Sequence, residues 1–228
     1  MNKTNIEGCD YTWNPITGCT RISPGCKNCY AHGIANRFNG GDFSIKFHPE
    51  RLGQPLDVKQ PSKIFVGSMT DMFHNEVRID WFRKVMEVVR TTKQHTFIVL
   101  TKRPENMSEE IMLAYQAAIK DGCYDNLWLG VSVCTRTDVD GLRHLKMIPA
   151  KVKFISVEPM LERISLGDYL SWLDWVICGP ENGKGARPMK EEWAEELSID
   201  CKDYDIPFFM KGELANKYGQ QFPGEETK

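Results

Sequence analysis

Short apolar runs alternate with segments of helical spacing along most of this chain. The runs are rich in β-branched and aromatic residues, as buried strands are, and the interval between them is roughly 20 to 35 residues, the length of a strand plus a crossover helix. This rhythm predicts a parallel sheet. We expect strands at 63–66, 96–100, 127–133, 153–157, 175–178 and 207–210, with 10–14 as a candidate for an earlier one.

The segments between these runs have the pattern of helices. In 80–92, Phe82, Val85 and Val89 recur at three- and four-residue intervals, while charged side chains occupy the other face. Proline before a segment and glycine after it mark other helix ends. We expect helices over 30–38, 80–92, 105–120 and 190–204.

Polar residues follow nearly every expected strand. They are Ser68, Thr70, Asp71, Thr101, Lys102, Arg103, Ser132, Ser156, Glu158, Glu181, Asn182 and Lys211. In a parallel barrel these strand ends open on one face, whereas an open doubly wound sheet brings fewer of them together. We therefore predict an α/β fold, a partial or complete (β/α) barrel of about six to seven parallel strands, with residues 1–228 as a single domain.

Three cysteines near the N-terminus form the most specific motif. Cys19, Cys26 and Cys29 have C-x6-C-x2-C spacing within a loop, 14–31, that prolines stiffen and glycines loosen, so one loop can turn three thiolates toward one point. Structural zinc sites are usually closed by four protein ligands, whereas a cluster or catalytic metal leaves a position for a small molecule. The motif predicts a metal-binding loop with an open position.

A zinc site is the main alternative for this loop. His32 follows Cys29 with two residues between, so Cys19, Cys26, Cys29 and His32 could complete a Cys3His tetrahedron that staples the N-terminal loop. The chain would then be a non-catalytic protein that binds nucleic acid or a host factor. A cluster that only transfers electrons or senses redox state is a third interpretation.

Composition limits the partners and the cellular location that we expect for this protein. The formal net charge of −2 gives no overall attraction to polyanions, so a nucleic acid would need a local basic patch. The apolar runs are too short to span a bilayer, which predicts a cytoplasmic protein that does not bind a membrane. Thiols stay reduced in that compartment, so the eight cysteines are interpreted as ligands, core residues or redox groups.

Two resemblances follow from these residues. The segments TWNPITGC, SPGCKNCYA, IFVGSMTDMFH, VLTKRPENM, LWLGVSV, FISVEPM, WVICGPENGKGARPM and PFFMKG resemble, over nearly the whole chain, a family of unknown function common in phages and prophages. The cysteine loop also resembles the cluster-binding loop of radical S-adenosylmethionine enzymes. Its spacing is wider than their C-x3-C-x2-C, and Asn28 stands where they have an aromatic residue, a place that Tyr30 could take.

The second resemblance implies an enzyme. It implies a [4Fe-4S] cluster on Cys19, Cys26 and Cys29, with S-adenosylmethionine on the fourth iron, an external electron donor, and a 5′-deoxyadenosyl radical as the reactive species. The candidate catalytic residues are Glu158, Asp71 and Lys102. The candidate cofactor-binding residues are Tyr30, Ser68, Asp71, Arg103, Ser132, Ser156, Glu158 and Glu181.

The substrate follows only from the phage association, which suggests a nucleotide, a nucleic acid or a related small molecule. Phosphate groups could be held by Lys102, Arg103, Arg187 and Lys211 without a basic protein overall.

Overall fold

The computed structural model describes residues 1–107 and 125–225. Its main feature is an eight-stranded sheet in the order β1-β2-β5-β6-β7-β8-β9-β10. The strands are β1 (Asn2–Lys3), β2 (Tyr11–Trp13), β5 (Lys63–Val66), β6 (Thr96–Thr101), β7 (Leu127–Ser132), β8 (Val152–Val157), β9 (Trp175–Cys178) and β10 (Phe208–Met210). All neighbours from β2 to β10 pair in parallel, and β1 is antiparallel to β2. A parallel sheet is therefore confirmed.

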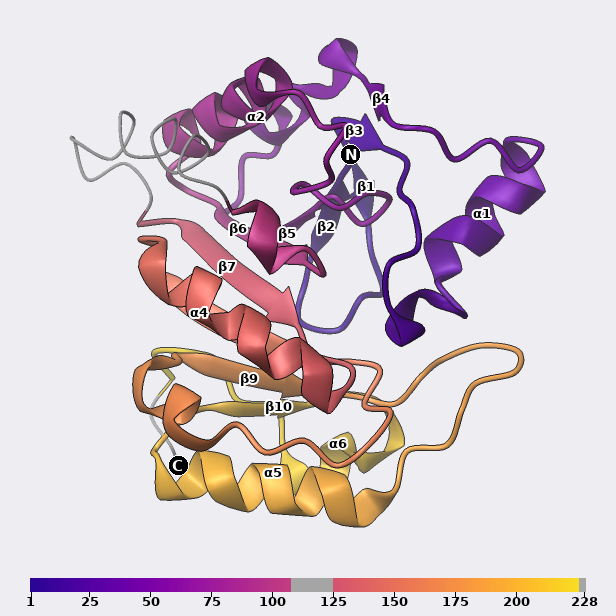
Figure 1. The fold of residues 1–228 in the computed structure, drawn as a ribbon. Coiled ribbons are helices and arrows are strands. Elements are labelled where there is room, and N and C mark those ends of the chain that lie inside the picture. Colours follow the sequence, from indigo (N-terminus) through magenta and orange to yellow (C-terminus); the bar gives the residue numbers. More distant parts are fainter. Residues whose placement is uncertain (108–124, 226–228) are drawn as a thin grey trace.

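Helices cover the outer face of this sheet. The α-helices are α1 (Tyr30–Phe38), α2 (Ile79–Thr91), α4 (Leu142–Met147), α5 (Glu191–Asp203) and α6 (Ala215–Tyr218). Short 3-10 helices lie at Pro24–Cys26, Pro49–Arg51, Gln54–Asp57, Pro104–Asn106, Arg136–Gly141, Gly167–Trp172 and Gly212–Leu214. In Figure 1, α2, α4 and α5 lie along the outside of the curved sheet, and α1 stands apart from them on the other side of the molecule.

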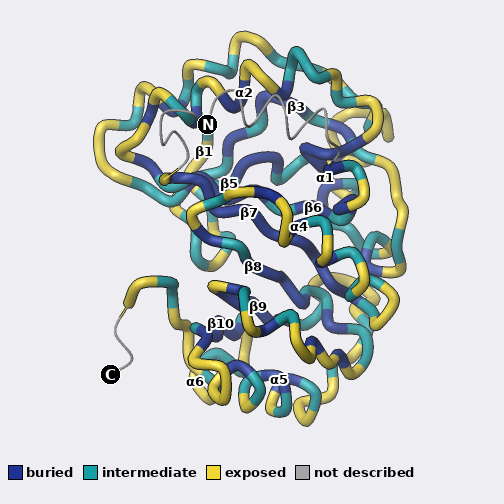
Figure 2. The backbone as a smooth tube through the Cα atoms, turned by 60° about the vertical axis from the view of Figure 1, so that its left-hand side comes forward, coloured by how far each residue is buried: buried dark blue, intermediate teal, exposed yellow. Residues whose placement is uncertain are grey.

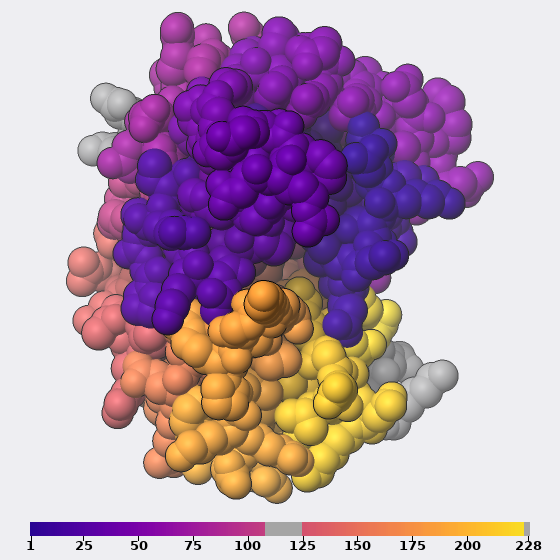
Figure 3. Space-filling model, turned by 90° about the vertical axis from the view of Figure 1, so that its right-hand side faces the viewer, coloured from indigo at the N-terminus to yellow at the C-terminus, as the bar shows by residue number. Residues whose placement is uncertain are grey.

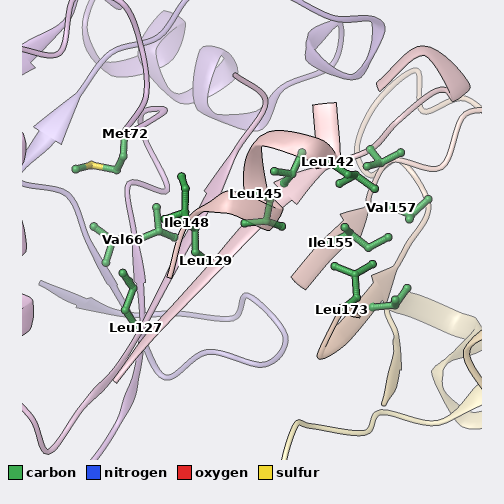
Figure 4. Packing of buried hydrophobic residues seen from close by; sticks show 14 of the residues in the cluster. Val66, Met72, Leu127, Leu129, Leu142, Leu145, Ile148, Ile155, Val157 and Leu173 are labelled. Carbon is green, nitrogen blue, oxygen red and sulfur yellow. The ribbon is translucent and has the colours of Figure 1, made fainter. Parts of the chain in front are cut away.

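Alternate side chains of each strand enter two different apolar clusters, as the period of two in a strand requires. In β6, Phe97 and Val99 pack toward the helices, and Ile98 and Leu100 toward the inside of the curve. The outer cluster is the larger, and Figure 4 shows part of it, with Leu129 of β7 near Ile148 at the end of α4. Figure 2 shows the central strands buried and the outward turns of the helices exposed. Because both faces of the strands are buried, the strands appear in the sequence as nearly continuous apolar runs.

The inner cluster fills the concave side of the sheet. It consists of Ile98, Trp128, Val152, Phe154, Trp175, Ile177 and Phe209, with Cys9, Phe65, Leu100 and Phe222 packed against it. The C-terminal segment reaches across the gap between the sheet edges, because Lys63 Nζ of β5 lies 3.5 Å from the ring centroid of Phe222. Glu7, in the connection from β1 to β2, accepts hydrogen bonds from Gly212 N (3.1 Å) and Gln220 Nε2 (2.6 Å). The sheet edges are joined by side chains.

This architecture is the partial form of the predicted barrel. Seven parallel strands are present, and among the described residues no backbone pairing joins β1 or β2 to β10. The complete barrel that we allowed as an alternative is therefore wrong: the strands stop short of closure, and a C-terminal segment fills the seam instead. Within residues 1–107 and 125–225, no helix combines the length and apolarity needed to cross a bilayer.

The expected elements differ from the observed ones mainly at the edges. The candidate strand at 10–14 is confirmed as β2, whereas β1, the short pair β3 (Ile16–Thr17) and β4 (Lys46–Phe47), and helices α4 and α6 were not expected. These elements are too short to produce a periodic pattern. The expected helix at 105–120 lies almost wholly outside the described residues.

Candidate functional site

A pocket of about 440 Å³ opens at the carboxyl ends of the parallel strands and continues into the inner cluster. It brings together the three cysteines and all the polar residues proposed from the sequence as catalytic or cofactor-binding. These are Cys19, Cys26, Cys29, Tyr30, Ser68, Asp71, Lys102, Arg103, Ser132, Ser156, Glu158 and Glu181, with Lys211 also in the lining. Figure 3 shows the N-terminal third of the chain, in indigo and purple, meeting the orange and yellow C-terminal segments over this side of the molecule.

The cysteine loop is fastened to the loop after β5. Gly18 N donates to Met69 O (2.9 Å), and Thr70 Oγ1 donates to Gly18 O (2.6 Å). Gly18 has a φ of +99°, and a Cβ there would lie 2.1 Å from the carbonyl oxygen of Ser44, so only glycine fits. These contacts fix the backbone of the cysteine loop at Gly18, one residue before Cys19.

A buried ion pair supports the next turn of the loop. Arg103 Nη1 lies 3.2 Å from Asp71 Oδ2, and both side chains are less than a tenth exposed. The other guanidinium nitrogen of Arg103 donates to Thr20 O (2.8 Å) and Thr20 Oγ1 (2.9 Å), and Nη1 also approaches Cys19 Sγ at 3.6 Å. Asp71 accepts further bonds from Thr101 Oγ1 (2.6 Å) and the backbone of Phe73 and Lys102. The pair therefore positions Cys19 through Thr20.

A second cluster holds the other end of the loop. Glu181 accepts hydrogen bonds from Asn28 Nδ2 (2.9 Å), from Arg187 N (2.8 Å) and from the Arg187 guanidinium, and Arg187 also donates to Pro24 O (2.9 Å). These bonds join the segment from Cys26 to Cys29 to the loop after β9. The hydrogen bonds from Arg187, above all, lower the pKa of Glu181 to about 2, so this carboxylate is ionised at neutral pH.

The thiols differ in their electrostatic surroundings. Burial raises the pKa of Cys19, although Arg103 opposes this shift. Burial also acts to raise the pKa of Cys26, but hydrogen bonds from the backbone of Ile22 and Ser23 and from the Ser23 hydroxyl outweigh it, and the pKa is lowered. Burial acts to lower the pKa of Lys102, but the negative charges of nearby thiolates, Cys134 and Cys26 first, raise it overall. Lys102 is thus a cation close to the thiols of this loop, whereas Arg103 is already paired with Asp71.

Cys19, Cys26 and Cys29 line one pocket. Among the described residues, no three Cys, His, Asp or Glu side chains are grouped closely enough to hold one metal ion. In an iron–sulfur cluster each thiolate binds a different iron, so a cluster does not require three sulfur atoms on one ion. That the three cysteines hold a metal stays a prediction.

His32 has surroundings that do not suit the Cys3His alternative. Its ring packs edge-on against Phe43, with centroids 4.7 Å apart, and its Nε2 atom is buried without a hydrogen-bond partner among the described residues. It does not line the pocket of the three cysteines.

The deeper part of the pocket combines an apolar floor with a few polar groups. The floor is formed by Phe65, Ile98, Leu100, Phe154, Trp175 and Ile177. Above it, Lys211 Nζ and Glu158 Oε2 form an ion pair at 2.8 Å, and Lys102 Nζ donates to Ser132 Oγ at 3.2 Å. Ser156, 1% exposed, makes no side-chain hydrogen bond to the described residues and is therefore available to a bound molecule. Pockets with apolar walls and a few polar groups bind small molecules.

The structure thus divides the candidates into two groups. Asp71, Arg103 and Glu181 are engaged with other protein groups that hold the cysteine loop, whereas Ser156, Glu158 and Lys102 face the pocket. Tyr30 lines the mouth and donates its hydroxyl to Ser68 O at 2.7 Å. Of the four proposed phosphate-binding residues, Arg187 does not line the pocket.

Sequence reasoning missed Thr20, which is an ordinary surface residue type that nothing in the chain marks. It named Asn28 and Gly25, but not the bond from Asn28 to Glu181 or the close fit of Gly25 against Cys134.

Comparison with known proteins places this chain in a family. It matches the family described as "Protein of unknown function (DUF5131)" over residues 3–224 and belongs to that family. A search of curated proteins gave no match.

Solved structures share the fold at low identity. Spore photoproduct lyase complexed with dinucleoside spore photoproduct superposes with a TM-score of 0.59 at 13% identity, over 89% of this chain and 75% of that one. A double mutant of that lyase, with bound AdoMet and dinucleoside spore photoproduct, gives a TM-score of 0.54 at 14% identity, over 83% of this chain and 71% of that one. The α/β fold predicted from the sequence is confirmed by these likenesses.

Proposed function

We propose that this protein is a radical S-adenosylmethionine enzyme. The observation that carries the proposal is that Cys19, Cys26 and Cys29 line the same pocket as the polar strand ends of a partial barrel. The fold is shared with a lyase whose structure holds AdoMet, which supports the same cofactor here.

In this proposal the three thiolates hold a [4Fe-4S] cluster. The bound cluster and S-adenosylmethionine supply a one-electron reductive cleavage that yields a 5′-deoxyadenosyl radical. The residues of this chain orient the cofactor and exclude water. Arg103 and Glu181 keep the loop in place, and Lys102 offsets negative charge near Cys26.

Ser132, Ser156 and Glu158 are the groups we assign to cofactor or substrate. Each stands on the inner face at the carboxyl end of β7 or β8, where strand ends of parallel barrels carry chemistry. We assign Tyr30, which lines the same pocket, to the adenine ring of the cofactor.

We propose a nucleotide or nucleic-acid fragment as the substrate class. The apolar floor with Phe154 and Trp175 suits a flat ring, and the Glu158–Lys211 pair offers a donor and an acceptor to its edge. The lyase with the similar fold is bound to a dinucleoside lesion, which supports this class.

The test begins with anaerobic purification and analysis of iron and sulfide. We expect about four irons per chain and a brown protein. The Cys26→Ala variant should lose the colour, whereas Cys201→Ala, on α5 away from the pocket, should keep it. Incubation with S-adenosylmethionine and dithionite should then release 5′-deoxyadenosine above a control without protein.

A colourless protein with one zinc per chain would instead support the non-catalytic alternative. The packing of His32 against Phe43, outside the pocket, counts against that alternative.

A further inference from the structure

An exposed apolar stripe lies on the helix that directly follows the third cysteine. Along α1, Ile34 and Phe38 are 41% and 72% exposed, and they lie four residues apart on one face. Ile22, within the cysteine loop, is 47% exposed. The buried residues of the helix are Ala31 and Ala35. At Ile34 and Phe38, by contrast, the helix presents large apolar side chains to the outside.

The chain segment that carries this stripe has charged side chains of one sign. No Asp or Glu occurs between Asp10 and Asp42, whereas the chain as a whole is net negative. Arg21, Lys27 and Arg37 are exposed in this interval, and the Arg37 guanidinium lies 6.0 Å from the ring centroid of Phe38. Asp42, at the end of the interval, is paired with Lys46. The exposed charged side chains that this segment offers to a partner are therefore basic.

We propose that this surface, defined by Ile22, Ile34 and Phe38 with the rim of Arg21, Lys27 and Arg37, is the docking site of an acidic one-electron carrier protein. The inference rests on the proposed function, because a bound cluster needs an external reductant. The docking surface and the cysteine ligands belong to one segment, 19–38, in which α1 begins directly after Cys29, so a carrier seated there would contact the segment that holds the cluster.

The size and chemistry of the surface fit such a carrier. Redox partners form small interfaces, toward the low end of interface size, so a few apolar side chains are sufficient. Interface cores are enriched in aromatic residues and Arg, with charged residues at the rim, which is the arrangement here. Nucleic-acid interfaces are more polar and much more positive, and isoleucine side chains cannot stack on bases. The carrier loses one electron and the cluster gains it, with no exchange of atoms.

The test measures binding as well as turnover. The probes are an acidic flavodoxin and an acidic [2Fe-2S] ferredoxin, titrated onto the reconstituted holoprotein. We expect binding by one of them that weakens with added salt, because the rim contributes opposite charge. The Ile34→Ser/Phe38→Ser variant should raise the Kd at least about tenfold, and Arg37→Glu should reduce the salt dependence.

Matched controls come from exposed side chains on other helices. Met147→Ser/Ile199→Ser removes two exposed apolar side chains from α4 and α5, and Lys202→Glu reverses an exposed charge on α5. Both should leave the Kd unchanged. Cleavage of S-adenosylmethionine driven by the reduced carrier should fall in Ile34→Ser/Phe38→Ser, whereas cleavage driven by dithionite should match the wild type.

Several results would overturn the docking site. One is a Kd weaker than about 1 mM for both carriers. Another is an equal Kd for Ile34→Ser/Phe38→Ser and the wild type. The last is a DNA complex or a homodimer that the wild type forms and that this variant loses. Failure of the proposed function is separate, because it would appear as absent iron or absent dithionite-driven cleavage in the wild type.

Discussion

The fit of Gly25 against Cys134 gives the sharpest test of how the cysteine loop is held. Gly25 is buried in the 3-10 turn Pro24–Cys26, and a Cβ at this position would lie 2.3 Å from Cys134 Sγ and 3.0 Å from its Cβ. Ordinary van der Waals contact begins about 1 Å farther out, so Gly25→Ala must push the turn, and Cys26 with it, away from the end of β7. Overpacking of this kind typically costs about 1–3 kcal/mol of the free energy of unfolding.

The assay is thermal unfolding of the apoprotein together with iron content after reconstitution. For a domain of this size, the cost corresponds to a fall in Tm of roughly 2–12 °C, and we expect less iron per chain. In a Cys134→Gly background the obstructing atoms are gone, so adding Gly25→Ala should lower the free energy of unfolding only slightly. The coupling free energy between the two substitutions should therefore equal most of the loss caused by Gly25→Ala alone.

Gly33 provides the matched control. It also lies within the cysteine-bearing segment, in α1, but a Cβ there would meet nothing within 4 Å. Gly33→Ala should therefore stabilise the protein by about 0.5–1 kcal/mol, because alanine favours a helix more than glycine does. A wild-type Tm and iron content for Gly25→Ala, or no coupling with Cys134→Gly, would refute the view that the loop rests against β7 at this point.

Two further predictions concern the ionic groups that hold the loop. Arg103→Met leaves Asp71 buried without its partner, so the free energy of unfolding measured in urea should fall by roughly 3–5 kcal/mol. The double variant Arg103→Met/Asp71→Leu should recover part of this loss. Equal stability of the single variant and the wild type would contradict the buried ion pair. The folded-state pKa of Glu181 is lowered to about 2, below its usual value of 4.5, so its contribution is present above pH 4.5 and is lost as the pH falls toward 2. The stability difference between wild type and Glu181→Gln should be constant from pH 6 to 8 and shrink below about pH 4.5; a difference that instead grows on acidification would show that Glu181 is not held as an anion by Arg187.

The fold was largely predictable because burial on both faces leaves a strong local pattern. The six main strands appear as apolar runs in the chain, and each ends near the polar residue that the structure places at the carboxyl edge of the sheet. The edge strand β1 and the short helices α4 and α6 were missed, since segments of two to six residues do not contain a full period of either pattern. The phage association, the cytoplasmic location and the single-domain organisation stay predictions.

The roles of the polar residues were less predictable than their location. Asp71, Arg103 and Glu181 were expected to bind a cofactor, which stays a prediction; in the structure Arg103 and Glu181 also bind the cysteine loop, and Asp71 holds Arg103. Their partners are far away in the chain: Arg103 reaches Thr20 across 83 positions, and Asn28 reaches Glu181 across 153. Local sequence carries no signal for such pairs.

The sequence by itself determined that parallel strands present their carboxyl ends on one side, because side chains alternate along a strand and crossover helices return each strand in the same direction. It also determined that three thiols lie on one short loop. Only the tertiary structure decided that the barrel stays open, with the C-terminal segment around Phe222 filling the seam, and which partner each charged group of the pocket takes. Hydrogen-bond and ion-pair partners are chosen by proximity in space, and that proximity exists only after the sheet has curved and brought the two ends of the chain together.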